Sequence, residues 1–304
     1  MAPLDLQLNG YAGVDFNADA LALDDLRRAC AAVRRDGGGR MLATVITDRL
    51  DRMAARITRL AELHAADADV RAVVAGIHVE GPFISPLPGF VGAHPAEHVL
   101  PAEVPAARQL VEAGRGLVRL LTLAPEHDRD LATTCWLREQ GVVVSAGHCD
   151  ASLERLREAV AAGLSGFTHL GNGCPLMLHR HDNIIQRVLM MPELRWVMVI
   201  PDGTHVPPAI LADYIRRIGL DRTIAVTDAT SAGGMGPGRF TLAGQEVVVG
   251  DDGAAWAADR SHFVGSTASM AQVCRVLERE IGLSAAEIEQ VTVVNPALAI
   301  GGAA

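Results

Sequence analysis

Residues 76–83 read GIHVEGPF, a short apolar run that ends in an acid, Glu80, before Gly-Pro stops any regular extension. Three more runs have this form and end in one polar residue each: His148 in VVVSAGHCD (142–150), His169 in GFTHLGNG (166–173) and Asp228 in IAVTDAT (224–230). Short runs that are rich in Val, Ile or Leu and bounded by Gly or Asp are typical of buried parallel strands. Polar residues at the carboxyl ends of such strands are typical of the active site of a (β/α)8 barrel.

Short apolar runs and helical patterns alternate along the whole chain and predict eight strand–helix units. Strands are expected at residues 4–8, 41–46, 70–79, 117–123, 142–146, 166–168, 196–200 and 223–227. Helices are expected near residues 23–35, 50–65, 103–113, 130–140, 152–162, 208–218 and 267–281, with an irregular stretch after residue 170 and a hairpin insertion at 239–242 and 246–249. We therefore predict an α/β fold, a TIM-like (β/α)8 barrel in which residues 1–304 form a single domain.

An open, doubly wound sheet would show the same alternation of strands and helices. Such a sheet would carry a phosphate or dinucleotide fingerprint after its first strand, and LNGYAGVDF (8–16) is not one. The barrel is therefore the favoured interpretation.

Composition narrows the classes of function. Of the 304 residues 49% are hydrophobic, which provides a sizeable core, and the net charge of -9 argues against nucleic acid or an anionic membrane as the general partner. Nowhere do about eighteen apolar residues run together, and the N-terminus lacks a charged leader. The five cysteines are scattered and never form a CxxC pair, so we expect a reduced, cytoplasmic protein.

The four strand-end residues suit metal-assisted hydrolysis. One carboxylate and two imidazoles, from Glu80, His148 and His169, suit a single Zn²⁺ and leave a position for water, although Fe²⁺, Co²⁺ or Mn²⁺ could use the same ligands. The further carboxylate of Asp228 could then work as the base. His78 and His94 are additional candidate ligands, but for His78, two residues before Glu80 on the same strand, we favour a packing role.

Several motifs together resemble the N-acetylglucosamine-6-phosphate deacetylase family of the amidohydrolase superfamily, from the beginning of the chain almost to its end. The most specific are HVEGPFISP with GAHP, AGHCDAS, THLGN, DGTHVPP, TDATSAGG and FVGSTASM. The resemblance implies that Glu80, His148 and His169 bind the metal and that Asp228 is the general base and then the general acid. It also implies that His205, in DGTHV, reaches the substrate carbonyl and steadies the oxyanion.

Further implications of the resemblance concern the substrate and the number of metal ions. The superfamily's usual first-strand HxH pair is replaced here by Gln7 and Asn9, and amides are feeble ligands for zinc, so one metal ion is expected rather than two. A role of these amides confined to hydrogen bonding at the barrel mouth is compatible with that expectation. By family correspondence, the sugar pocket would be lined by Ala93, Asn172, Gly173, His205, Phe263, Val264 and Gly265.

Two features depart from the family pattern. Members usually carry a small β-sandwich domain built from residues on both sides of the barrel, and this chain is expected to lack it, which would leave a bottom or flank to be covered in another way, for example by a subunit contact. Members also have an REPG segment whose arginine reaches the phosphate of the neighbouring subunit's substrate. Here that segment is absent, and Arg180, His181 or Arg187 could supply replacement charge. Arg180 could equally lie on a solvent-facing loop, and a homodimer is a family expectation only.

The expected function is a metal-dependent deacetylase that hydrolyses the acetamide of an N-acetylated amino sugar, with N-acetylglucosamine 6-phosphate as the leading substrate. An amidohydrolase acting on an unphosphorylated or different N-acyl compound is an alternative, motivated by the missing REPG segment. A non-catalytic barrel is a third interpretation, which the joint presence of Glu80, His148, His169 and Asp228 argues against.

Overall fold

The computed structural model describes residues 2–301, and its centre is an eight-stranded sheet in which every neighbouring pair is parallel. The strands follow in chain order: β1 (Leu4–Leu8), β4 (Arg40–Ile46), β5 (Val74–Glu80), β6 (Val118–Leu123), β7 (Val143–Ala146), β8 (Leu164–Phe167), β9 (Trp196–Val199) and β10 (Thr223–Ala225). The N–H of Asp228 donates to the carbonyl of Gln7 (2.9 Å), which joins the chain after β10 to β1 and brings the sheet round into a barrel. The predicted (β/α)8 fold is confirmed.

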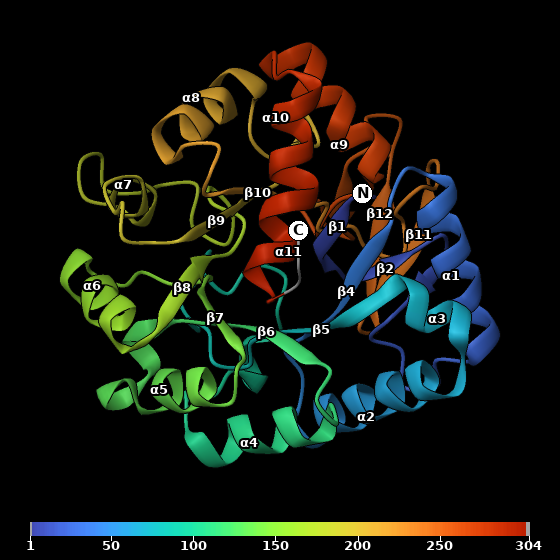
Figure 1. The fold of residues 1–304 in the computed structure, drawn as a ribbon, viewed down its shortest axis with the longest axis horizontal. Helices are drawn as coiled ribbons and strands as arrows, with labels where there is room; N and C mark the ends of the chain where they lie inside the picture. The colour runs from blue at the N-terminus through green and yellow to red at the C-terminus, as the bar shows by residue number, and fades with distance from the viewer. Residues whose placement is uncertain (1, 302–304) are drawn as a thin grey trace.

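Helices surround the barrel (Figure 1). They are α1 (Leu23–Arg35), α2 (Leu50–Ala66), α3 (Ala68–Val73), α4 (Val104–Ala113), α5 (Ala132–Glu139), α6 (Leu153–Ala162), α7 (Ile184–Leu189), α8 (Pro208–Ile218), α9 (Met270–Val276), α10 (Ala285–Glu289) and α11 (Asn295–Ala299). In α1 the buried side chains recur at helical spacing (Leu26, Ala29, Cys30 and Val33), with acids in the first turn and arginines in the last. Such an amphipathic pattern explains why α1 and α8 have the predicted bounds.

Two segments differ from the sequence-based expectation. The strand expected from residue 70 begins at Val74, because Asp67 accepts a hydrogen bond from the N–H of Val70 and caps the short helix α3. The stretch expected to be irregular contains α7, which Asn183 caps in the same way through the N–H of Gln186. Side-chain caps allow helices too short to show a clear apolar period.

The predicted hairpin insertion is present and has a third strand. Strands β11 (Gly238–Leu242), β12 (Gln245–Val249) and β13 (Ala255–Ala257) form an antiparallel sheet, and a separate small pair joins β2 (Gly10–Tyr11) to β3 (Val14–Asp15). The apolar residues of the insertion, including Leu242, Val247 and Val249, pack on Ile46 and Val264. This contact lays the insertion against the carboxyl end of β4, beside the cavity described below.

The amino ends of the strands are covered by the chain's own C-terminal segment. Figure 1 shows α11 lying across the middle of the strand ring. Asn295 donates two hydrogen bonds, to the carbonyl of Leu220 (2.7 Å) and to that of Thr223 (2.6 Å), and Ala299 packs with Leu4 in one buried cluster. At this end the cover is therefore intramolecular.

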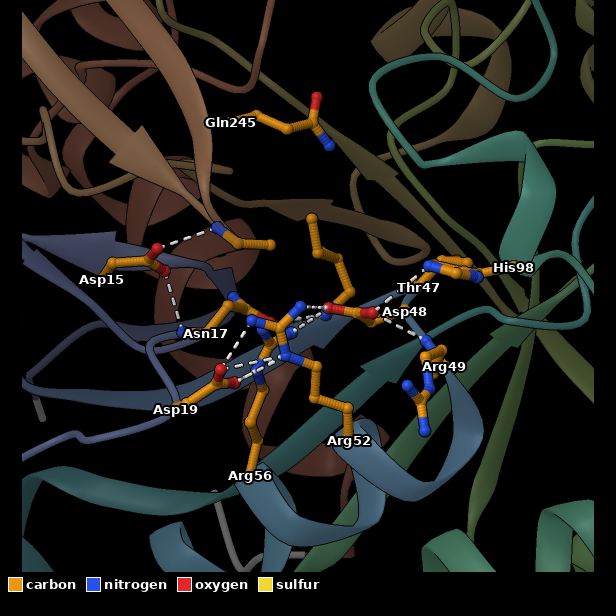
Figure 2. Close-up of polar contacts among 12 residues, drawn as sticks. Asp15, Asn17, Asp19, Thr47, Asp48, Arg49, Arg52, Arg56, His98 and Gln245 are labelled. Carbon is orange, nitrogen blue, oxygen red and sulfur yellow. Dashed lines mark hydrogen bonds and ion pairs between the residues drawn. The ribbon is translucent and has the colours of Figure 1, made fainter.

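A buried ion-pair network holds α2 to the end of β4 (Figure 2). The side chain of Arg56 is only 2% exposed, and its guanidinium lies 2.9 Å from Asp48 Oδ2 and 3.0 Å from Asp19 Oδ1. Asp48, also buried, accepts a hydrogen bond from the N–H of Arg49 (2.7 Å) and lies 3.6 Å from His98 Nε2. Asp48 thereby links the barrel, α2 and the long loop after β5.

Replacing Arg56 by Met should destabilise the protein, because the carboxylate of Asp48 would stay buried after losing its most buried partner. We expect the free energy of unfolding to fall by about 3 kcal/mol, measured by chemical denaturation. Arg52 is a matched control, since its side chain is 46% exposed and pairs mainly with the exposed Asp19. Arg52→Met should cost less than about 1 kcal/mol, and equal losses in the two variants would contradict the assignment.

The buried carboxylate of Asp5 links β1 to the chain after β10 by hydrogen bonds. It accepts hydrogen bonds from the N–H groups of Gln7 (3.1 Å) and Thr227 (3.2 Å) and from the Thr227 hydroxyl (2.5 Å). Burial raises the pKa of Asp5 to about 6, although these hydrogen bonds oppose the shift. The folded chain therefore holds the Asp5 proton more tightly than the unfolded chain does, and stability due to this group falls as the pH rises towards 6.

Comparison with an Asp5→Asn variant should isolate this pH dependence. The stability of the wild type relative to the variant should decrease by at most about 3 kcal/mol between about pH 4 and pH 7, measured by denaturation at each pH. Asp15, whose pKa burial also raises to about 6, is present in both proteins and cancels. A difference that is constant with pH would show that Asp5 ionises normally.

Candidate active site

The four strand-end residues singled out in the sequence meet in one cavity of about 540 Å³. A volume of this size is in the range of small-molecule sites. The cavity is lined by Glu80, His148, His169 and Asp228 together with His94 and His205, and walls of it come from the loop after β5, the segment after β8 and the hairpin insertion. The carboxyl ends of strands far apart in the sequence therefore supply one group of polar side chains.

Glu80, His148 and His169 form a buried cluster that could hold a metal ion. Glu80 Oε1 lies 3.0 Å from His169 Nε2 and 3.4 Å from His148 Nε2, and the two imidazole nitrogens are 3.1 Å apart. Lone pairs that converge in this way repel one another unless a proton or a cation lies between them. The donor set and its closeness fit one divalent ion.

Surrounding contacts orient these side chains. His148 Nδ1 lies 2.8 Å from the carbonyl of Phe90, so Nδ1 donates and Nε2 keeps its lone pair for a ligand. Glu80 Oε1 accepts a hydrogen bond from the amide of Gln7 (2.9 Å). Burial disfavours the charged form of Glu80, but the bonds and charges of His148 and His169 outweigh it and hold the pKa of Glu80 well below its usual range.

Asp228 is the second buried carboxylate of the cavity. Burial, and next the negative charge of Glu80, raise the pKa of Asp228 to about 7. Its Oδ1 accepts a hydrogen bond from the amide of Asn9 (2.7 Å). Gln7 and Asn9 thus donate N–H groups to the two carboxylates, as expected for amides that hydrogen-bond at the barrel mouth. A carboxylate titrating near neutral pH is suited to general base and acid work.

Three of the four strand-end residues have left-handed backbone conformations, with φ of 51° at His148, 33° at His169 and 50° at Asp228. A residue other than glycine held there typically costs on the order of 1–3 kcal/mol, and such positions concentrate at functional sites. Gly173, also at positive φ, passes so close that a Cβ would lie 2.9 Å from His148 Nδ1. The main chain is therefore bent sharply to turn the two imidazoles towards the cavity.

His205 is held by a residue that sequence reasoning missed. Its Nδ1 lies 2.7 Å from Asp202 Oδ2, while Asp202 Oδ1 accepts the N–H groups of Thr204 (2.8 Å) and His205 (2.9 Å). Although burial favours the neutral acid, hydrogen bonding and charge from His205 lower the pKa of Asp202. Asp202 therefore fixes the ring and leaves Nε2 for the cavity; the signal was an acid three residues before the histidine.

His94 lies closer to the cluster than the sequence could show. Its Nε2 is 3.9 Å from Glu80 Oε2, and its ring centroid is 4.5 Å from that of His148. Its Nδ1 lies 2.8 Å from the hydroxyl of Thr47, at the end of β4. His78, by contrast, is fully buried and does not line the cavity; its Nε2 lies 2.8 Å from the hydroxyl of Thr122, and burial lowers its pKa to about 4, in keeping with the expected packing role.

The residues expected to line the sugar pocket separate into two groups. Ala93, Asn172, Gly173, Phe263 and Gly265 do line the cavity, whereas Val264 is buried under the insertion. The lining also includes Trp256 and His262, which sequence reasoning missed because β13 is too short to show a strand pattern.

The candidate phosphate-binding arginines lie outside the cavity lining. Arg187 is held by Asp150 (2.8 Å) and Asp182 (2.6 Å), so its charge is already paired. Arg180 and His181 are exposed, between the cavity-lining Leu176 and α7. Of these three, Arg180 is the cation that remains available to a ligand, because within residues 2–301 it takes part in no ion pair.

Two broader expectations can also be compared with the structure. No helix within residues 2–301 is long and apolar enough to cross a membrane. All five cysteines (Cys30, Cys135, Cys149, Cys174 and Cys274) are free, and Cys30 and Cys149 are buried.

Comparison with known proteins places this geometry in a family, although no family model matches the chain. The chain is 31% identical to N-acetylgalactosamine-6-phosphate deacetylase of Escherichia coli O157:H7, over 99% of this chain and 77% of that protein. It is 33% identical to human N-acetylglucosamine-6-phosphate deacetylase, over 98% of this chain and 73% of that protein.

A solved structure of the same kind of enzyme is also similar to this chain. The N-acetyl-D-glucosamine-6-phosphate deacetylase of Mycobacterium smegmatis, in a variant bound to N-acetyl-D-glucosamine-6-phosphate, superposes with a TM-score of 0.90 at 31% identity, covering 99% of this chain and 77% of that chain. With the barrel, the cluster of Glu80, His148 and His169, and Asp228 beside it, these likenesses show that the chain belongs to the N-acetylglucosamine-6-phosphate deacetylase family of amidohydrolases.

Proposed function

We propose that this chain is a metal-dependent deacetylase that converts an N-acetylated amino sugar 6-phosphate, first of all N-acetylglucosamine 6-phosphate, into the free amino sugar phosphate and acetate. The observation that carries the proposal is the meeting of Glu80, His148, His169 and Asp228 in one buried cavity. The relatives act on the gluco or the galacto sugar, as their names say, so N-acetylgalactosamine 6-phosphate is the second substrate to test.

Glu80, His148 and His169 would hold the metal ion, which we expect to be a single Zn²⁺. One carboxylate with two imidazoles is a frequent donor set of catalytic zinc sites. A divalent ion bound there would supply Lewis acidity for water activation and for polarising the acetamide carbonyl. The amides of Gln7 and Asn9 already donate to the two carboxylates, which supports one ion rather than two.

Asp228 is the proposed proton carrier. It would accept a proton from the water that attacks the acetamide carbon, and it would deliver that proton to the amine nitrogen as the C–N bond breaks. An amine leaves poorly without this proton. A pKa of about 7 allows both steps near neutral pH, because the group is neither too weak a base nor too weak an acid.

His205 is proposed to face the negative charge that develops on the carbonyl oxygen. Asp202 holds its Nδ1 and leaves Nε2 as the nitrogen that meets the substrate. His94, whose Nε2 lies 3.9 Å from Glu80 Oε2, adds a further imidazole to the cavity lining. Because these side chains are held before substrate arrives, little reorganisation is needed during the reaction.

Arg180 is the proposed phosphate contact. In the family that the sequence resembles, the arginine of the REPG segment reaches the substrate of a neighbouring subunit. Arg180, exposed and outside the lining of its own cavity, is proposed to take the place of that arginine. A homodimer is therefore part of the proposal.

We also propose that residues 1–304 act as one domain in the cytoplasm, since the insertion and the barrel line the same cavity and the cysteines are free.

A second candidate function is hydrolysis of an unphosphorylated N-acyl sugar. It is favoured by one observation: within the described residues 2–301, the cavity lining contains histidines but no arginine or lysine.

Purified protein of known metal content should release amine from N-acetylglucosamine 6-phosphate with about one divalent ion per chain. Asp228→Asn should lower kcat by about 10²–10⁴-fold while the metal content stays unchanged, because the proton carrier is lost and the ligands remain. Amine release is measured from N-acetylglucosamine and N-acetylgalactosamine, each with and without the 6-phosphate. Preference for an unphosphorylated sugar would select the second candidate, and no release from any of the four would refute both.

Arg180→Ala should raise KM for the 6-phosphate about tenfold and leave turnover of the unphosphorylated sugar unchanged, because a charge-assisted contact to phosphate is lost. Arg129→Ala is the matched control, since the Arg129 side chain is 96% exposed and does not line the cavity. Steady-state kinetics on both sugars provide the measurement. An equal effect on both substrates, or none, would remove Arg180 from phosphate recognition.

A further inference from the structure

A row of three rings runs along one wall of the cavity. The centroids of Trp256 and Phe263 are 4.3 Å apart at an interplanar angle of 45°, and those of Phe263 and His205 are 4.9 Å apart at 47°. All three residues line the same cavity as Glu80 and Asp228. We call Trp256 and Phe263 the aromatic wall. It ends at His205, the residue proposed above to face the reacting carbonyl.

The aromatic wall is built by backbone pairing between β13 and the chain that follows it. Trp256 and Phe263 form an antiparallel bridge, flanked by bonds from the N–H of Val264 to the carbonyl of Ala255 and from the N–H of Ala257 to the carbonyl of His262 (both 3.0 Å). The insertion thus carries Trp256 to a fixed place beside Phe263. Such pairing makes the wall a preformed surface rather than a chance contact of loose side chains.

Trp256 is only partly buried, with the guanidinium carbon of Arg260 6.0 Å from its ring centroid, so part of its apolar ring stays exposed at the cavity. Its indole N–H donates to Asp252 Oδ2 (3.1 Å), so the polar edge of the ring is already satisfied away from the cavity. Phe263 is also partly buried. The chain has only 3 Trp and 6 Phe. Two of these few large rings are adjacent and only partly covered, and both line the cavity that holds Glu80 and Asp228. Large aromatic rings left in this state commonly provide contact area for a partner or ligand.

We infer that the aromatic wall is an apolar subsite that binds the C–H face of the substrate's pyranose ring while the acetamide reaches His205 and Asp228. This inference rests on the proposed function and adds a recognition element, Trp256, that the family motifs did not indicate. In a chair pyranose the axial hydrogens form a flat apolar face, while the hydroxyls project at the rim. The negative face of an aromatic ring attracts such C–H groups.

The ring form of the sugar therefore matters more to this subsite than any single hydroxyl. The open-chain alditol made by reducing the sugar keeps the acetamide, the hydroxyls and the 6-phosphate but has no pyranose face. Comparing the two substrates isolates the contribution of the face. Comparing them again without Trp256 shows whether the aromatic wall recognises it.

The experiment measures kcat and KM for N-acetylglucosamine 6-phosphate and for 2-acetamido-2-deoxyglucitol 6-phosphate in the wild type and in Trp256→Ala. In the wild type, kcat/KM should favour the pyranose by about tenfold. In the variant KM for the pyranose should rise about tenfold, with kcat nearly unchanged, and the preference should disappear. Trp256→Phe should restore it because a ring face is present again.

Controls separate recognition from folding and from the proposed function. Melting temperatures show whether Trp256→Ala keeps the fold; if it does not, Trp256→Leu fills much of the space without a ring and replaces it. Equal losses for both substrates, or an unchanged preference, would overturn the inference and reduce Trp256 to a residue that packs the insertion. If the wild type turns over neither of the two substrates, the proposed function is refuted instead, and the inference falls with it.

Discussion

The site depends on placing two carboxylates, Glu80 and Asp228, side by side in a buried cavity. Each is costly to bury as an anion, and each raises the cost of ionising the other. The two carboxylates have different partners. Glu80 is held ionised by His148, His169 and the amide of Gln7. For Asp228, burial and the negative charge of Glu80 outweigh the charge of His169 and the hydrogen bond from Asn9, and the pKa rises to about 7. This division suits the proposed roles, in which one carboxylate binds a cation and the other carries protons during hydrolysis.

The backbone that carries these side chains is also strained, and the barrel must maintain the strained conformation. His148, His169 and Asp228 all sit at positive φ, and a chain free to relax would leave that region. Parallel strands fix the residues just before each bend, while the backbone bond from Asp228 to Gln7 joins the first and last strands at the same level. The stiffness of the closed sheet therefore fixes the positions of the polar groups. The buried pairing of Arg56 with Asp48 serves the same end where α2 meets β4.

The eight strands, most of the helices and the four strand-end residues could be predicted from the sequence, because each is a local pattern: an apolar run, an amphipathic period or a polar residue after a run. What could not be predicted depends on contacts between distant segments. Asp202 acts on a neighbour and could have been suspected, but the proximity of Thr47 to His94 and of Trp256 to Phe263 arises only when the loop after β5 and the insertion fold onto the barrel. A strand as short as β13 has no period to detect. The ion pairs of Arg187 could not be predicted for the same reason, since its partners are two acids, one of them 37 residues away.

The barrel and the insertion therefore contribute different things to one cavity. Barrel strand ends supply the groups to which we assign the chemistry, and these groups need a fixed geometry because a small displacement of a proton carrier or a ligand removes its effect. The insertion, with the loop after β5 and the segment after β8, supplies the outer lining of the cavity, including Trp256, where complementary shape and polarity suffice. Loops and insertions can change without disturbing the strands, so recognition can be altered while the reaction is kept. The named relatives include both a gluco and a galacto sugar phosphate deacetylase, each similar to this chain over nearly its whole length. A difference of this kind between substrates is one that an altered outer lining could produce while the strand-end groups stay the same.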